Sequence, residues 1–353
     1  MIGRREAGEI LLKLVEVYTP SGNESRIKET LTEICLKLGF ERCYFDEIGN
    51  FFAEYGEGEP ILLASHIDTV PGELDSSFDG EIIRGRGAVD AKGPLTAFIL
   101  GASEAMKEIS GVKVRVAGLV HEESDGLGAK YLVEKGCKAR YVLIGEPTNL
   151  GIAIAYRGSV TAEIYAEARG GHSSAPYVGE SALDKILNFV GELRSRFNGS
   201  SYDEVTSAVT VLNAGDWPSK LPEKARAIVN IRFPKPYSPD SIIEEIEGIA
   251  KRSDARIKLI DSTPPVEVGL RSKAVRALMR GCLRNGVKPR LVKKTGTSDM
   301  NTLAELTEHI AAFGPGDSKL AHTNAEELSV DDLLKAARIV ASALIELSKD
   351  AVS

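Results

Sequence analysis

Five side chains of the types that bind divalent metals stand in short, glycine-punctuated motifs of this 353-residue chain. They are His66, Asp90, Glu123, Glu146 and His322. Zinc and cobalt accept imidazole and carboxylate ligands from proteins. Four of the motifs directly follow apolar runs typical of buried strands, which are Ile61–Ala64, Val114–Val120, Tyr141–Ile144 and His309–Phe313. Because ligands bind beyond the carboxyl ends of strands in an open α/β sheet, the sequence predicts a two-metal hydrolase site at that edge.

Asp90 is the candidate for the carboxylate that a pair of metals must share. It stands in G-R-G-A-V-D-A-K-G, which matches neither of the common phosphate-binding glycine patterns. A purely structural glycine turn remains the alternative. His66 and Asp68 lie two residues apart at a strand end, so we expect His66 to bind metal and Asp68 to orient its ring. Taken alone, a histidine at a strand end is more often structural.

Glu122 and Glu123 are neighbours, and consecutive residues at a strand end point in different directions. One carboxylate can therefore bind metal while the other serves as general base. The zinc motif H-E-x-x-H is not met, because Asp125 stands where the second histidine would be. Taken singly, the acidic pair could be a solvated loop, and Glu146 could pair with a surface lysine.

The surrounding pattern is typical of an α/β fold with a mostly parallel sheet. Expected helices of this part are Arg26–Leu38, Pro94–Glu108, Gly126–Lys135, Ser272–Asn285, Met300–Leu306 and Val330–Ser348. A β-α-β-β-α-β order is expected from Ser159–Ala168, Ser181–Phe197, Val205–Leu212, Ala225–Phe233, Asp240–Lys251 and Ala255–Ile260. We therefore predict a catalytic domain of residues 1–157 and 264–353, with an inserted α+β domain of residues 158–263.

Composition narrows the class of protein further. A net charge of −7 argues against nucleic acid as the main partner. Apolar runs are short, so no membrane span and no signal peptide are expected. Four cysteines form no C-x-x-C pair, which favours free thiols in a reducing cytoplasm over disulfides. The chain contains no glutamine, a bias that resembles thermophile proteins.

The motifs S-H-I-D-T-V-P, G-R-G-A-V-D-A-K-G-P, H-E-E-S, G-E-P-T, G-G-H-S-S-A-P and A-H-T-N together resemble the M20 family of dimetal metallopeptidases and deacylases. The resemblance spans nearly the whole chain. It implies that Asp90 bridges two metals, that His66 and Glu146 hold one of them, and that Glu123 and His322 hold the other. Glu122 would then be the general base, and a cis peptide bond is expected after Asp90.

The same resemblance implies that the inserted domain is a lid that also forms a homodimer. His172 of G-G-H-S-S would reach the partner's active site and stabilise the oxyanion, as a catalytic residue. Arg232 of N-I-R-F-P would bind a substrate carboxylate through its bidentate fork. Asn213 and Thr297 are weaker substrate-binding candidates.

Longer motifs such as K-P-R-L-V-K-K-T-G-T-S-D-M-N and F-G-P-G-D-S-K-L-A-H-T-N resemble the archaeal lysine/ornithine hydrolases that act on an amino-group carrier protein, formerly named acetyl-lysine deacetylases. The resemblance implies release of lysine or ornithine from the carrier's C-terminal glutamate in lysine and arginine biosynthesis. Arg290, Lys293 and Lys294 could form a basic rim for an acidic carrier, or an ordinary solvated patch. Deacetylation of N-acetyl-ornithine or N-acetyl-lysine, desuccinylation of succinyl-diaminopimelate, and dipeptidase or carboxypeptidase activity are the alternatives.

Overall fold

The computed structural model describes residues 2–352, and the chain divides into two compact units. The first unit contains the chain up to Ile154, Val268–Val292, and the chain from Ser298 onward. The second contains Ala155–Glu267 and Lys293–Thr297. The predicted insertion, residues 158–263, is one continuous segment, whereas in the structure the short stretch Lys293–Thr297 also belongs to the second unit. Among residues 2–352, no helix is both long and apolar enough to cross a membrane.

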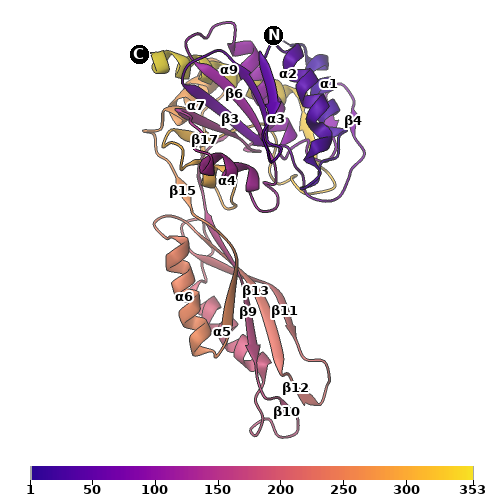
Figure 1. The fold of residues 1–353 in the computed structure, drawn as a ribbon, viewed down its shortest axis with the longest axis vertical. Helices are drawn as coiled ribbons and strands as arrows, with labels where there is room; N and C mark the ends of the chain where they lie inside the picture. Colours follow the sequence, from indigo (N-terminus) through magenta and orange to yellow (C-terminus); the bar gives the residue numbers. More distant parts are fainter. Residues whose placement is uncertain (1, 353) are drawn as a thin grey trace. The chain divides into compact units, whose positions relative to one another are not determined.

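The first unit is built on one large sheet whose central strands are parallel (Figure 1). Its strand order is β1 (Arg42–Phe45), β2 (Phe51–Tyr55), β6 (Lys113–Leu119), β3 (Pro60–His66), β7 (Tyr141–Gly145), β17 (Ile310–Ala312) and β8 (Ile152–Tyr156), and β15 (Val266–Glu267) and β16 (Leu291–Lys294) pair with β8. Residues 61–66 of β3 are all buried, as expected for a strand covered on both faces. The predicted fold class is confirmed.

Helices surround this sheet. They are α1 (Arg4–Val15), α2 (Lys28–Lys37), α3 (Lys92–Ala105), α4 (Leu127–Glu134), α7 (Lys273–Arg284), α8 (Asp299–Leu303) and α9 (Val330–Val352), with a 3₁₀ turn at Glu24–Ile27. α3 and α7 contact the sheet, and α9, yellow in Figure 1, packs on both of them. A small second sheet has the strand order β18 (Glu327–Ser329), β5 (Ile82–Arg84) and β4 (Ser77–Phe78).

The second unit is a four-stranded antiparallel sheet with two helices on one face (Figure 1). The strand order is β11 (Thr206–Ala214), β13 (Lys224–Phe233), β9 (Gly158–Glu167) and β14 (Arg256–Thr263). The helices are α5 (Ala182–Arg196) and α6 (Pro239–Arg252), and a short ribbon pairs β10 (Gly171–His172) with β12 (Lys220–Leu221). Alternate residues of β13 are buried, so one sheet face packs on the helices while the other stays open. The β-α-β-β-α-β order is as predicted.

Candidate metal and catalytic site

Three parallel strands of the first unit end level with one another and carry the predicted ligands just beyond. His66 is the last residue of β3 and pairs in register with Leu119, the last residue of β6. Gly145 ends β7 opposite Ser65, and the Ser65 hydroxyl donates a hydrogen bond to the Gly145 carbonyl at 2.9 Å. The His66 side chain, the turn after β6 and Glu146 therefore start from the same edge of the sheet.

Asp90 presents one carboxylate oxygen to each of two histidines. Its Oδ1 lies 3.1 Å from His66 Nε2, and its Oδ2 lies 3.4 Å from His322 Nε2. His322 Nε2 also lies 2.8 Å from Glu123 Oε1. Ligand atoms of His66, Asp90 and Glu123 all lie within 4.8 Å of one another. The structure thus places Asp90 between two imidazoles, which is the arrangement that a bridging carboxylate requires.

Asp68 is fully buried and fastens the neighbouring loop. Its two oxygens accept the backbone N–H groups of Glu122 and Glu123, each at 3.1 Å. Ser21 Oγ donates to the same carboxylate at 2.7 Å. His66 Nδ1 lies 2.9 Å from the Asp68 carbonyl oxygen and 3.5 Å from its carboxylate. Asp68 therefore fixes His66 mainly through its backbone, while its side chain fixes the two glutamates.

The electrostatics separate the acids of the site. Burial raises the pKa of Glu122 well above its usual range; the charge of His66 opposes this, and that of Glu146 adds to it. Burial also opposes the charged form of Asp90, but hydrogen bonds from His322 and His66 outweigh it and hold the Asp90 pKa below its ordinary value. The ionised form of Asp90 is therefore favoured, as a metal ligand requires, whereas the raised pKa makes the Glu122 carboxylate the stronger base of the two.

The same hydrogen bonds act on His322. Its contacts with Asp90 and Glu123 raise the pKa of the His322 imidazole to about 10. His322 adopts a left-handed backbone with φ of 63°, and His121, next to the glutamate pair, has φ of 62°. Non-glycine residues rarely take this conformation, and they concentrate at functional sites. A cis peptide joins Asp90 to Ala91, as the resemblance had implied.

Glu146 and Asp299 complete the acidic surroundings. Glu146 follows β7 and is 8% exposed, and its charge acts on Glu122. Asp299 begins α8 and is 4% exposed. Burial raises the pKa of Asp299 to about 7; the charge of His66 opposes the shift, and that of Asp68 adds to it. In the motif T-G-T-S-D-M-N the sequence predicts a role only for Thr297, and nothing in the motif marks Asp299 as buried beside the site.

The remaining predicted residues all lie in the second unit. Arg232 Nε donates to Asn230 Oδ1 at 2.9 Å, and its Nη1 donates to Thr297 Oγ1 at 3.3 Å. Arg232 and Thr297 are thus brought together. Asn213 lies away from them. It pairs with Arg226 near one end of the β11–β13 ladder, whereas Arg232 pairs with Thr206 at the other end.

His172 is exposed in the β10–β12 ribbon of the second unit. Its Nδ1 accepts the backbone N–H of Ser174 at 3.1 Å, which leaves the proton of the neutral ring on Nε2. The neutral ring therefore has one N–H donor, at Nε2.

The basic rim anticipated from sequence is largely engaged within the chain. Lys293 pairs with Asp203 at 3.3 Å and with Glu267 at 3.2 Å, and its ammonium lies 5.0 Å from the Tyr202 ring centroid. Arg290 donates to the Asn149 carbonyl at 2.8 Å. These contacts favour the interpretation as an ordinary basic patch.

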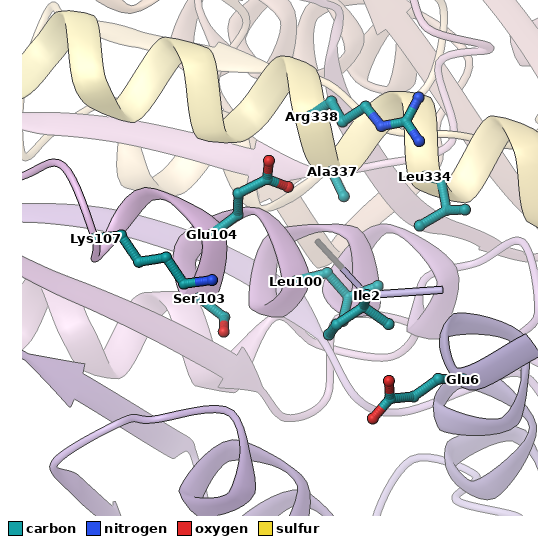
Figure 2. Close-up of a pocket in the computed structure, with 9 residues that line it drawn as sticks. All are labelled: Ile2, Glu6, Leu100, Ser103, Glu104, Lys107, Leu334, Ala337 and Arg338. Carbon is teal, nitrogen blue, oxygen red and sulfur yellow. The ribbon is translucent and has the colours of Figure 1, made fainter. Parts of the chain in front are cut away.

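A cavity of about 220 Å³ lies elsewhere in the first unit, between α1, α3 and α9 (Figure 2). Apolar Ile2, Leu100 and Leu334 line it beside charged groups of both signs. It contains none of the residues that the sequence singled out.

Comparison with known proteins agrees with this geometry. Residues 62–346 match the family model described as peptidase family M20/M25/M40. The chain is 37% identical over 347 residues to the LysW-lysine/LysW-ornithine hydrolase of Saccharolobus solfataricus and 36% identical over 345 residues to that of Saccharolobus islandicus, covering 98% of this chain and 96% of each relative. The aminopeptidase PepT of Bacillus cereus shares the fold, with a TM-score of 0.82 and 20% identity over 98% of this chain and 99% of that one.

Proposed function

The chain belongs to peptidase family M20/M25/M40 and is a hydrolase of amide bonds, and we propose that it releases lysine, and also ornithine, from the C-terminal glutamate of an amino-group carrier protein in lysine and arginine biosynthesis. Relatives matching nearly the whole chain and named LysW-lysine/LysW-ornithine hydrolases support this substrate. The observation that carries the chemistry is Asp90, whose two oxygens face different imidazoles.

The donor set fits two divalent metals. The side chains of His66, Asp90, Glu123 and His322 converge, and Glu146 is close enough for its charge to act on Glu122. Hydrogen bonds from the two imidazoles favour the ionised form of Asp90. His66 and Glu146 would hold one ion, Glu123 and His322 the other, and Asp90 both. Zinc suits these ligands, and cobalt does as well. Such ions, when bound, acidify water and polarise the amide carbonyl.

Glu122 is the group that moves the proton. It is half-buried, its backbone is fixed by Asp68, and desolvation raises its pKa, so its carboxylate is a stronger base than that of an exposed glutamate. In the proposed reaction it takes a proton from the attacking water, the C–O bond forms, and the same proton passes to the α-amine as the C–N bond breaks. The products are free lysine or ornithine and the carrier's glutamate carboxylate.

The second unit would bind and orient the substrate. We propose that residues 158–263 form a lid and a homodimer contact. In this arrangement the Nε2–H of His172 would donate to the oxyanion in the partner subunit's site. Arg232, positioned by Asn230 and Thr297, would bind the α-carboxylate of the departing amino acid. Asn213, at the far end of the ladder from Arg232, would bind substrate only as part of a different subunit's site.

The proposed setting is the cytoplasm of a thermophile. All four cysteines are free thiols, as in a reducing compartment. The glutamine-free composition fits a thermophilic source.

The deciding test compares substrates. Zinc-loaded and cobalt-loaded enzyme would be given a carrier protein bearing γ-glutamyl-linked lysine or ornithine, alongside N-acetyl-lysine, N-acetyl-ornithine, succinyl-diaminopimelate and a dipeptide panel. We expect kcat/KM to be highest on the carrier adducts. Preference for a small acylated amino acid would replace the proposed substrate with a deacylase substrate, and preference for dipeptides would make the enzyme a peptidase.

A further inference from the structure

Glu326, four residues after His322, is 2% exposed and lies against the loop that carries Asp90. One carboxylate oxygen, Oε1, accepts three backbone N–H groups: Gly87 at 2.9 Å, Val89 at 3.0 Å and Asp90 at 3.1 Å. Burial raises the pKa of Glu326, and the backbone N–H donors and the Arg86 charge oppose that shift by stabilising the ionised carboxylate. The amide of Asp90 itself is therefore held by the Glu326 side chain.

Arg86 occupies the other side of Glu326. Its Nη1 donates to Glu326 Oε2 at 3.0 Å and to the carbonyl of Thr323 at 3.1 Å, one residue from His322. Its Nε donates to the carbonyl of Gly72 at 2.8 Å. The side chains of Arg86 and Glu326 are 6% and 1% exposed, so the pair is buried. One guanidinium thus joins the Asp90 loop, the His322 loop and the loop after β3.

Strand pairing fixes the backbone position of Glu326. Glu327 of β18 pairs with Arg84 of β5, and the Gly85 N–H donates to the Glu326 carbonyl at 3.2 Å. The backbone of Glu326 is therefore held in register with the start of the Asp90 loop. The same register brings the Glu326 side chain against the backbone of the Asp90 loop.

We propose that Glu326 and Arg86 act as a clamp of two positioning residues, which holds Asp90 and His322 at the spacing that metal binding requires. A buried ion pair adds little net stability, because desolvation offsets its attraction. The pair does impose geometry, since each hydrogen bond ends on a ligand-bearing loop. Groups behind metal ligands commonly set affinity in this way.

This inference rests on the proposed dimetal site, and the test separates the two. Metal-free protein would be titrated with Co²⁺, following its visible absorption, and unfolded thermally without metal. In Glu326→Gln the amide keeps one acceptor oxygen, so either the three N–H groups or Arg86 loses its partner. We expect cobalt affinity to fall about 10- to 100-fold with an altered visible spectrum.

Glu54→Gln is the matched control. Glu54 is 6% exposed, and its Oε1 accepts from Arg115 Nε at 2.7 Å and from Tyr44 at 3.1 Å, away from any ligand-bearing loop. Both variants should lower the unfolding temperature of the metal-free protein, but only Glu326→Gln should weaken cobalt binding. Equal cobalt affinity in the two variants would overturn the clamp. Absence of cobalt binding by the unaltered protein would instead overturn the dimetal site, and the clamp with it.

Arg86→Lys provides a second variant if Glu326→Gln does not fold. Lysine retains the charge opposite Glu326 but lacks the planar fork that reaches three acceptors. A loss of cobalt affinity of about tenfold is expected, as for other groups behind metal ligands. Unchanged affinity in Arg86→Lys would contradict the clamp.

Discussion

Glu122 is the residue on which the proposed chemistry depends most directly. Replacing it with glutamine keeps the shape of the side chain and removes the basic oxygen. We expect kcat to fall by about 10²- to 10⁴-fold, the range typical of a lost general base. Metal content should stay at the level of the unaltered enzyme, because Glu122 is not a proposed ligand. Turnover by steady-state assay and metal content by elemental analysis check both points.

Retained turnover in Glu122→Gln would mean that another residue is the general base, and Asp299 would be the next carboxylate to test. Lost metal would instead make Glu122 a ligand. Ser124→Ala, in the same loop, serves as a control, since within residues 2–352 the hydrogen bonds of Ser124 Oγ are to the ring and the carbonyl of His121.

The sequence predicted the types and strand-end positions of the ligands, but not the residues behind them. His66 and Glu123 could be recognised because they are metal-binding types at the ends of apolar runs, and Asp90 because it stands in a glycine-rich motif. Glu326 could not, because its partner Arg86 lies 240 residues earlier and only strand pairing brings them together. Asp299 could not be recognised either, because the raised pKa of its carboxyl comes from burial, which its motif does not indicate. The roles of the ligands themselves stay predictions until metal binding is measured.

Among the elements, those with a long periodic pattern were predicted best. The apolar run of β3 predicts a strand buried on both faces, and the alternation of β13 predicts one buried face. Short elements were not predicted: β4, β5 and β18 have two or three residues each, and β5 pairs both with its neighbour β4 and with the distant β18. The helix predicted at Met300–Leu306 is shorter in the structure, where α8 spans Asp299–Leu303. Local sequence carries too little signal for elements of that length.

Glycines in two helices allow a test of how the elements pack. A Cβ added at Gly101 of α3 would lie 2.6 Å from the Ala337 carbonyl oxygen of α9, whereas one added at Gly191 of α5 would meet no neighbouring atom within 4 Å. Gly101→Ala should therefore destabilise the protein by about 1–3 kcal/mol, as overpacking does. Gly191→Ala should stabilise its helix by up to about 1 kcal/mol.

Chemical unfolding, followed by far-ultraviolet circular dichroism, measures both effects. Opposite signs are expected for the two alanines. A neutral Gly101→Ala would mean that α3 and α9 separate at little cost, which their shared burial in the core argues against.

The proposed metal ligands and the proposed substrate-binding residues lie in different units of the chain. All five proposed ligands lie in the first unit, and Arg232, His172 and Asn213 lie in the second. Each unit has its own apolar core. Metal should therefore stabilise the first unit directly, because a ligand stabilises only the state that binds it.

Removing metal should change hydrogen exchange in one unit and not in the other. Without metal, the loops of His66, Asp90, Glu123 and His322 keep their mutual hydrogen bonds but lose the ions that their side chains would share, so their local opening should become easier. At metal concentrations about 100 times the dissociation constant, the lost stabilisation is about 2.7 kcal/mol. Hydrogen-exchange mass spectrometry after chelation should show faster exchange in residues 66–69, 85–91, 121–124 and 320–326. Exchange in β13 should be unchanged, because it carries no proposed ligand and its amides pair within its own sheet. Equal acceleration in β13 would mean that metal stabilises the two units as one cooperative body, and re-adding zinc should reverse whichever change is seen.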